Sequence, residues 1–252
     1  MEDDQITLTQ EEHLEILEEF KFWSGPYLVR ILEDSSDGPM TLGSGGLLEY
    51  KERYFVLTNA HVIKNVENPE ENIIVPYTIN DEKTYKMSIK SISKDTLKDI
   101  AIIEIDKSKQ FDGSNHKFLP GTYIETDVES YSEKCNMVFC HGYPTFSTFV
   151  DTRNKVIDAE TFPYGTFISE FSKKYNSLFV LVADEGTSEH GDTVEIPLVS
   201  GMSGSFVYGY YLDEIPRYKC LGVLTNWHRV DNLLEIYPIN EFIDYLEENF
   251  LG

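Results

Sequence analysis

The stretch LTNAHVIKNV, residues 57–66, places His61 at the point where a hydrophobic run ends. Runs rich in Val, Ile, Phe, Tyr and Thr that are bounded by turn residues are typical of β-strands. A histidine at the end of such a strand is either a polar residue tolerated near the surface or a base in nucleophilic catalysis. The catalytic interpretation requires two partners in the same chain: a nucleophile that loses its proton to the histidine, and an acid that orients the histidine.

Candidates for both partners follow His61 in the sequence. The segment KDIAIIEI places Asp99 at the head of an apolar strand, and SGMSGSFVYG places Ser203 between glycines. Gly201 and Gly204 permit a backbone conformation that points successive N–H groups at one place. An oxyanion hole requires this arrangement, and the N–H groups of Gly201 and Ser203 would supply it. Taken singly, each residue also fits a structural role, as a turn serine, a strand-opening aspartate or a hydrogen-bonded histidine.

The segments around these motifs predict a β-protein. Over most of the chain, short runs of β-branched and aromatic residues alternate with turns, which favours barrels or a sandwich over an α/β sheet. The polar stretch near residues 108–122 is the best internal boundary. A helix is predicted at each end of the chain. Thr9 and Glu12 can form a capping box for an acidic helix over residues 9–21, and Asn240 can cap a C-terminal helix.

Together these motifs resemble those of the trypsin-like serine proteases, which have the chymotrypsin fold. TNAHVI is similar to the family's histidine segment, DIAII to its aspartate segment and GMSGS to its serine segment. Four flanking segments resemble those of HtrA-like and bacterial trypsin-like members: GSGGLLEYKERYFVLTNAHVI, VFCHGYP, LGVLTNW and YPINEF. The likeness covers about residues 40–245, and the chain leaves no room for the peptide-binding module that HtrA-like proteins append.

The resemblance implies an all-β fold of two six-stranded antiparallel β-barrels, with an N-terminal and a C-terminal α-helix. The active site is then expected in the cleft between the barrels. The expected segments are an acidic N-terminal helix at 1–24, an N-terminal barrel at 25–118, a C-terminal barrel at 119–238 and a C-terminal helix at 239–252.

The resemblance also implies a role for each motif residue. His61 and Asp99 come from the N-terminal barrel and Ser203 from the C-terminal barrel. His61 is expected to take the Ser203 proton as the hydroxyl attacks a peptide carbonyl, while Asp99 holds the imidazole in the required tautomer. The backbone N–H groups of Gly201 and Ser203 form the expected oxyanion hole.

The chain departs from the secreted trypsins in how it could be activated. In those enzymes a newly cut N-terminus pairs with an aspartate next to the nucleophile, and here that neighbour is Met202. This zymogen switch therefore cannot operate. The polar segment ADEGTSEHGDTVEIP, residues 183–197, suggests another device, in which a partner or substrate orders this loop. An ordinary surface loop is the alternative.

The primary specificity pocket is predicted to be uncharged. Trypsins that cut after Lys or Arg carry an aspartate six residues before the nucleophile, and this chain has Pro197 there. Asn226 and Trp227 are expected to line the pocket wall. Two further histidines lie on motif segments: His141 is assigned a structural role, and His228 lies where the rim of the cleft is expected.

Composition restricts the class of protein further. The 252 residues include 44 acids and 21 bases, a formal charge of −23 that disfavours binding to nucleic acids and anionic membranes. No hydrophobic stretch approaches the roughly 18 residues of a transmembrane helix. The N-terminal residues lack the pattern of a signal peptide. Three cysteines, Cys135, Cys140 and Cys220, are interpreted as reduced thiols rather than zinc ligands. We therefore expect a cytoplasmic protein that uses no metal or cofactor.

The sequence thus predicts an intracellular trypsin-like serine endopeptidase that cleaves proteins or peptides, with an activating protein partner left open. Two alternatives remain. The chain could be a catalytically inactive binding or scaffold protein that keeps the protease fold, or an acyl hydrolase that uses the same three residues. An α/β-hydrolase is disfavoured because its order of catalytic residues ends with the histidine, whereas here the order is His, Asp, Ser.

Overall fold

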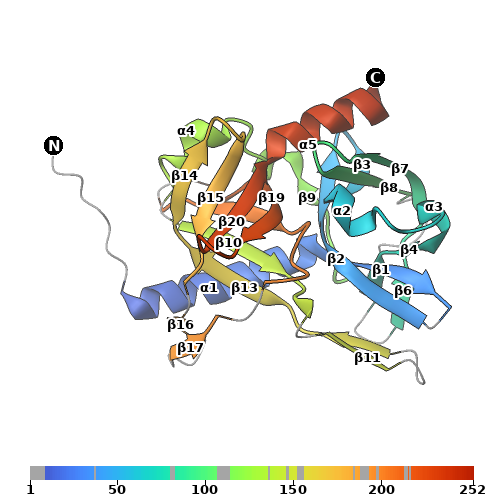
Figure 1. Cartoon of the computed structure of the whole chain (residues 1–252), viewed down its shortest axis with the longest axis horizontal. Coiled ribbons are helices and arrows are strands. Elements are labelled where there is room, and N and C mark those ends of the chain that lie inside the picture. Colours follow the sequence, from blue (N-terminus) through green and yellow to red (C-terminus); the bar gives the residue numbers. More distant parts are fainter. Residues whose placement is uncertain are drawn as a thin grey trace.

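The body of the molecule is built on two curled antiparallel sheets (Figure 1). The computed structural model describes residues 9–36, 38–79, 83–106, 114–135, 137–145, 148–151, 156–183, 185–187, 193–196, 199–212, 215 and 217–252. No helix in these ranges is long and apolar enough to cross a membrane.

The N-terminal sheet has the strand order β4-β1-β2-β3-β8-β7, and β9 pairs with β2 in parallel. Its strands are β1 (Leu28–Ser35), β2 (Gly38–Tyr50), β3 (Arg53–Thr58), β4 (Ile73–Ile74), β7 (Ile89–Asp95), β8 (Ile100–Ile105) and β9 (Leu119–Pro120). The C-terminal sheet has the order β13-β10-β18-β19-β20-β15-β14. Its strands are β10 (Met137–Gly142), β13 (Phe162–Thr166), β14 (Ile168–Ser172), β15 (Ser177–Leu181), β18 (Phe206–Tyr210), β19 (Tyr218–His228) and β20 (Leu233–Pro238).

Each main sheet therefore contains seven strands in the described part of the chain, where six were expected. In the N-terminal sheet, two of the seven strands are only two residues long: β4 pairs with β1 at the edge of the sheet, and β9 pairs with β2. Three separate pairs of strands complete the β-structure: β5 (Pro76–Ile79) with β6 (Lys83–Lys86), β11 (Thr148–Asp151) with β12 (Val156–Ala159), and β16 (Glu185–Thr187) with β17 (Thr193–Glu195).

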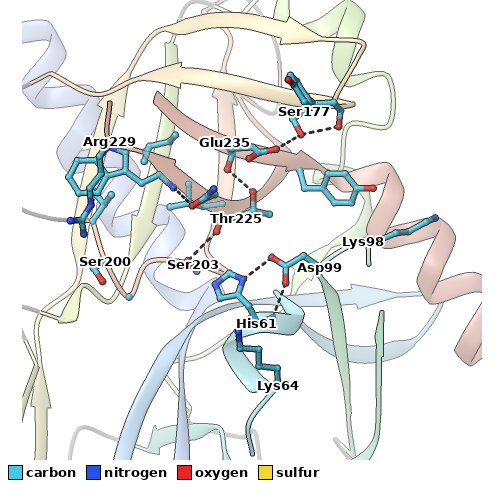
Figure 2. A pocket seen from close by; sticks show the side chains of 18 of the residues that line it. His61, Lys64, Lys98, Asp99, Ser177, Ser200, Ser203, Thr225, Arg229 and Glu235 are labelled. Atoms are coloured by element: carbon cyan, nitrogen blue, oxygen red, sulfur yellow. Dashed lines mark hydrogen bonds and ion pairs between the residues drawn. The ribbon is translucent and has the colours of Figure 1, made fainter. Parts of the chain in front are cut away.

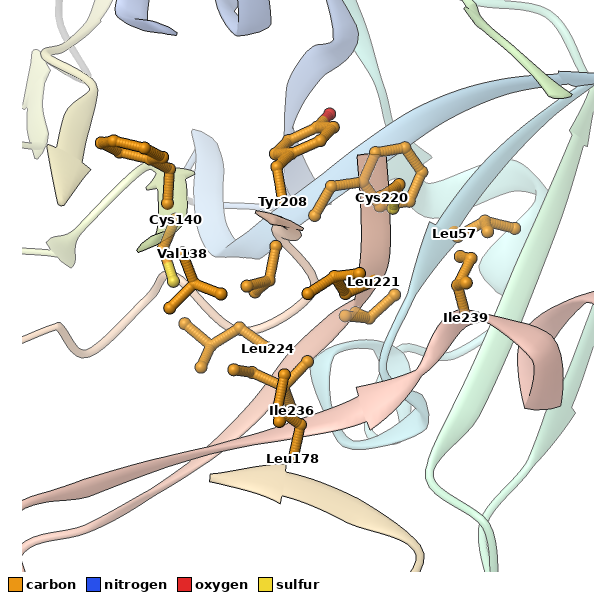
Figure 3. Close-up of a cluster of buried hydrophobic side chains, with 14 of the residues drawn as sticks. Leu57, Val138, Cys140, Leu178, Tyr208, Cys220, Leu221, Leu224, Ile236 and Ile239 are labelled. Carbon is orange, nitrogen blue, oxygen red and sulfur yellow. The ribbon is translucent and has the colours of Figure 1, made fainter. Parts of the chain in front are cut away.

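Strand β8 shows how the two halves share a core. All of its residues are buried, so its sequence IAIIEI is continuously hydrophobic apart from one glutamate rather than alternating. Ala101 and Ile103 face the core of the N-terminal sheet, whereas Ile100 and Ile102 belong to a cluster that extends into the C-terminal half. A strand that is covered on both faces needs apolar side chains on both faces. Figure 3 shows part of this shared cluster, with Leu57 of β3 beside Ile239 and near side chains of the C-terminal sheet.

Helix α1 (Gln10–Ser24) packs against the C-terminal sheet, beneath β10 and β13 (Figure 1). The predicted capping box is confirmed: the Thr9 side chain accepts from the Glu12 N–H, and the Glu12 side chain accepts from the Thr9 N–H. The apolar face of the helix is anchored by rings. Phe20 is fully buried and stacks on Phe139 with centroids 4.8 Å apart.

Helix α5 (Ile239–Leu246) follows β20 without a break and continues as a π-helical turn, Glu247–Leu251. The prediction that Asn240 caps this helix is wrong, because the N-cap is Pro238 and Asn240 lies inside the first turn. The strand runs directly into the helix, which leaves no intervening residue for a side-chain cap. The helix then crosses to the N-terminal half (Figure 1), where Glu247 accepts hydrogen bonds from Tyr50 at 2.7 Å and Lys51 at 2.5 Å.

Candidate active site

His61 and Asp99 are brought together by strand pairing. His61 lies on the short helix α2 (Ala60–Ile63) just after β3, and Asp99 lies in the turn just before β8. Strands β3 and β8 pair with Thr58 opposite Ala101, so the residues that follow β3 and precede β8 meet at the same end of the sheet. The turn gives Asp99 a backbone φ of +56°, which is uncommon for a residue with a side chain and is often found at functional sites.

The Asp99 carboxylate contacts His61 through both oxygens (Figure 2). The distance from His61 Nδ1 to Asp99 Oδ2 is 2.7 Å, and the His61 backbone N–H donates to Oδ1 at 2.8 Å. An ionised carboxylate only accepts hydrogen bonds, so Nδ1 carries a hydrogen, and in the neutral imidazole Nε2 then has the free lone pair. The imidazole is therefore oriented with its basic nitrogen available to a nucleophile, as the sequence predicted for a catalytic base.

Ser203 lies in the turn before β18, between two glycines with φ of +93°. A Cβ atom at Gly204 would lie 2.0 Å from the Ser44 carbonyl oxygen, and one at Gly201 would lie 2.8 Å from the Thr145 backbone nitrogen. Both positions thus require glycine for backbone conformation and for space. Gly204 therefore allows the nucleophile turn to lie directly against the N-terminal sheet, and Gly201 allows it to lie against the backbone at Tyr143 and Thr145.

The backbone N–H groups of this turn divide into two sets. Those of Met202, Gly204 and Ser205 donate to backbone carbonyls at 2.9–3.1 Å. Those of Gly201 and Ser203 find no acceptor among the residues that the structure describes. Both residues are half-buried, and two donors that face no acceptor at the nucleophile are suited to bind a developing oxyanion.

Ser44, on β2, ties the nucleophile turn to the N-terminal sheet. Its hydroxyl donates to the Gly201 carbonyl at 3.0 Å and accepts from the Tyr143 N–H at 2.9 Å. Its backbone N–H donates to the Ser203 carbonyl at 3.0 Å. With the carbonyls on either side fixed, the N–H groups of the turn are held in one orientation. The sequence analysis gave Ser44 no such role, although it lies within the quoted GSGG segment.

The Ser203 hydroxyl makes no hydrogen bond to His61 in this structure. Its Oγ donates to the carbonyl of Thr225 at 3.3 Å, and the described site contains no hydrogen bond between Ser203 and His61 (Figure 2). Both side chains nevertheless line one cleft, of about 820 Å³, together with Asp99 and Gly201. A rotation of the serine side chain about its Cα–Cβ bond is the change that moves the hydroxyl away from Thr225.

The predicted wall residues Asn226 and Trp227 both line this cleft. Pro197, the third residue predicted for the pocket, lies outside the described residues. The cleft also contains the carboxylate of Glu235, which the prediction of an uncharged pocket did not take into account. It lies on β20 between Leu234 and Ile236, which are fully buried. A charged residue between two apolar ones in the strand sequence LLEIYP was the signal that could have placed Glu235 on the face opposite Leu234 and Ile236.

The two remaining histidines have different surroundings. His141 is buried on β10, where its Nδ1 lies 2.8 Å from the Ser24 hydroxyl of α1, which supports a structural role. Burial lowers the pKa of His141 to about 4, with a smaller contribution from the charge of Lys21. His228, at the end of β19, contacts Glu235 at 2.8 Å between Nε2 and Oε2.

The cysteines are separate and unreactive. Cys140 and Cys220 are buried in the shared core, and Cys135 is half-buried. Burial raises the pKa of the Cys135 and Cys140 thiols to about 12, and it raises that of Cys220 further. The described residues contain no cluster of three or more His, Cys, Asp or Glu side chains that could hold a metal ion.

The polar segment at 183–197 is described in part. Strands β16 and β17 pair within it, with Glu185 opposite Glu195 and Thr187 opposite Thr193. The hypothesis that a partner orders this segment stays a prediction.

No protein-family model matches this chain, and no curated protein matches it. Among solved structures, the fold is similar to that of a scabies mite inactivated protease paralogue, SMIPP-S-D1. The TM-score is 0.59 and the sequence identity is 12%, over 92% of this chain and 94% of the mite protein. The chain therefore has the chymotrypsin-like fold that the sequence predicted, and at this identity the likeness establishes the fold alone.

Proposed function

We propose that this protein is a trypsin-like serine endopeptidase that cleaves proteins or peptides with His61, Asp99 and Ser203. The observation that carries the proposal is that both carboxylate oxygens of Asp99 contact His61, one at the ring and one at the backbone N–H, in the cleft that contains Ser203. A surface histidine needs no such orientation, whereas a general base that must present Nε2 to a hydroxyl does.

The residues support an acyl-transfer mechanism in which each proton has a place to go. Ser203 Oγ attacks the substrate carbonyl carbon as its proton moves to His61 Nε2. The oxyanion is held by the N–H groups of Gly201 and Ser203, and Asp99 stabilises the imidazolium. His61 then gives the proton to the leaving amine, which departs and leaves an ester on Ser203. Water attacks that ester as its proton moves to His61; the bond to Ser203 Oγ then breaks, His61 returns the proton to Oγ, and the acid product leaves.

The hydrogen bond from Ser203 to Thr225 favours a step before chemistry in which the hydroxyl turns towards His61. We propose that binding of substrate, or of an activating protein partner, favours the turned state. The expected setting is the cytoplasm, since reduced thiols are stable there. Hydrogen exchange along residues 185–187 and 193–196 tests the partner hypothesis, because strong protection in the free protein contradicts ordering by a partner.

A second candidate is a binding protein that keeps the fold without catalysis. The orientation of the Ser203 hydroxyl favours it, and the mite protein of similar fold is an inactivated paralogue. The presence of all three side chains favours the enzyme, as do the N–H groups of Gly201 and Ser203, which find no acceptor among the described residues. An acyl hydrolase with the same residues differs only in substrate.

Labelling with a fluorophosphonate probe tests the proposal, because the probe modifies serines that are activated by a base and an oxyanion hole. We expect wild-type protein to be labelled and Ser203→Ala to remain unlabelled, with equal melting temperatures. Cleavage of denatured casein, compared with hydrolysis of a p-nitrophenyl ester, separates the peptidase from the acyl hydrolase. Absence of labelling of folded protein, both alone and in lysate of the native host, would falsify the catalytic proposal.

A further inference from the structure

We propose that Glu235 is a specificity-determining residue whose carboxylate accepts a cationic side chain, Lys or Arg, of the bound substrate. This inference rests on the proposed function of the cleft. Glu235 lines the same cleft as His61 and Ser203, and its backbone carbonyl accepts a hydrogen bond from Thr225 Oγ1 at 3.0 Å. Thr225 is also the residue that holds the Ser203 hydroxyl, so Glu235 lies close to the nucleophile (Figure 2).

The carboxylate is held in a fixed position by two donors. Ser177 donates to Oε1 at 2.9 Å, and His228 Nε2 lies 2.8 Å from Oε2. Ser177 is buried and belongs to β15, whereas His228 belongs to β19, so the two neighbours of β20 both contribute. A carboxylate has about four acceptor sites, and two of them remain for a ligand. The Glu235 carboxylate is therefore a hydrogen-bond acceptor with a fixed orientation in the cleft.

The burial of Glu235 makes its charge effective. Its side chain is 24% exposed, so the carboxylate is partly shielded from water but reachable. A charge that is partly shielded by protein interacts with a ligand more strongly than one in open solvent. A cationic side chain is therefore attracted, and an anionic one is repelled.

Three cationic side chains also line the cleft, and their charges would favour an anionic substrate side chain over a cationic one. Lys64, Lys98 and Arg229 are all exposed, so water and salt screen them. Lys98 is paired with Glu241 at 3.6 Å, and the Arg229 guanidinium lies 5.0 Å from the centre of the Trp227 ring. The half-buried carboxylate therefore decides the preference, and the formal charge of −23 favours approach of basic substrates.

The cleft also offers apolar surface for the stem of such a side chain. Tyr175 is 58% exposed and Leu97 is 96% exposed, and both line the cleft with Glu235. Lys and Arg side chains cover apolar surface with their methylene groups while their charged ends reach a polar partner. The combination of an exposed ring, an exposed leucine and a fixed carboxylate fits this type of side chain.

Selection from a random peptide library tests the inference without requiring catalysis. Ser203→Ala serves as bait, beside Ser203→Ala with Glu235→Gln and Ser203→Ala with Glu129→Gln. Glu129 is a matched control, since it forms an ion pair with Lys173 at 2.6 Å away from the cleft. We expect enrichment of Lys or Arg at one peptide position with the first and third baits, and its loss with the second. Enrichment of Asp or Glu, or no change with Glu235→Gln, overturns the inference.

Kinetics on the active protein give the second readout. Peptides that carry Lys at the selected position are compared with peptides that carry norleucine there. We expect Glu235→Gln to lower kcat/KM for the Lys peptide by about tenfold or more, mainly through KM, and to leave the norleucine peptide unchanged. An equal loss on both peptides indicates a structural role and overturns the inference. Fluorophosphonate labelling of Glu235→Gln at the wild-type rate shows separately that the catalytic residues are intact.

Discussion

The carboxylate of Asp99 holds both the ring and the backbone of His61, at 2.7 Å and 2.8 Å. Replacing Asp99 by Asn keeps the shape but places an N–H donor opposite Nδ1, which favours the tautomer with the hydrogen on Nε2. That tautomer cannot take a proton from Ser203. By analogy with other Ser-His-Asp triads, we expect Asp99→Asn to lower kcat by about 10⁴-fold. The melting temperature and the rate of fluorophosphonate labelling measure stability and activity separately. A loss of less than tenfold would show that Asp99 does not orient the base.

Ser44 connects the two halves of the site, and its removal tests how far the nucleophile turn depends on the N-terminal sheet. In Ser44→Ala the Gly201 carbonyl loses a donor and the Tyr143 N–H loses an acceptor. Because Ser44 is fully buried, we expect the free energy of unfolding to fall by about 1–3 kcal/mol. We also expect slower fluorophosphonate labelling, since the oxyanion donors flank these groups.

A matched control for Ser44→Ala is Ser35→Ala, which removes a local hydrogen bond of 2.6 Å to Gly38 at the far end of β1. This variant should lose stability without losing activity per folded molecule. Equal labelling rates in the two variants would mean that Ser44 stabilises the fold but does not shape the oxyanion hole.

Substitutions of the two glycines that flank Ser203 are expected to have different effects, one on folding and the other on activity. An added Cβ at Gly204 meets the Ser44 carbonyl oxygen at 2.0 Å, and both groups belong to packed backbone. We expect Gly204→Ala to prevent folding or to lower the melting temperature severely. At Gly201 the nearest atom is the Thr145 nitrogen at 2.8 Å, a less severe contact than at Gly204, but one that the peptide must shift to relieve. We expect Gly201→Ala to fold and to lose about 100- to 1000-fold in turnover through misdirected donors. Full activity in Gly201→Ala contradicts the assignment of its N–H.

The parts of the site that could be predicted from the sequence depend on neighbours along the chain. His61 and Asp99 flank two hydrophobic runs, and pairing of those runs brings them together. The glycines beside Ser203 indicate the turn directly. The capping box at Thr9 is likewise a pattern of four adjacent residues. Each motif is encoded within a short segment, so it could be recognised before the pairing of β3 with β8 was known.

The parts that could not be predicted depend on contacts between distant segments. Glu235 lies in the cleft because β20 pairs with β15 and β19 in one register, and a shift by one residue would bury it. The role of Ser44 arises where β2 meets a turn more than 150 residues later. The Ser203 rotamer depends on whether its hydroxyl donates to the Thr225 carbonyl or to His61. Asn240 was misplaced because the strand leads into the helix sooner than its capping preference suggests.

The burial of His141 predicts a pH dependence of stability. Burial, together with a smaller contribution from Lys21, lowers its pKa in the folded protein to about 4, whereas a histidine in the unfolded chain has a pKa of about 6.5. Between these values the unfolded state binds the proton and the folded state does not. Stability is therefore lost as the pH falls from about 6.5 to 4, by up to about 3 kcal/mol from this residue.

Urea denaturation at pH values from 5 to 8 measures this dependence. His116, half-buried in the N-terminal half, acts in the same direction because burial lowers its pKa to about 4. The comparison is therefore between His141→Gln and His116→Gln, each of which should flatten part of the slope. His141→Gln should also lose stability at pH 8, since His141 packs against Phe20 and bonds with Ser24. A wild-type slope in His141→Gln would show that this histidine has the same pKa in the folded and unfolded protein, so that α1 does not bury it.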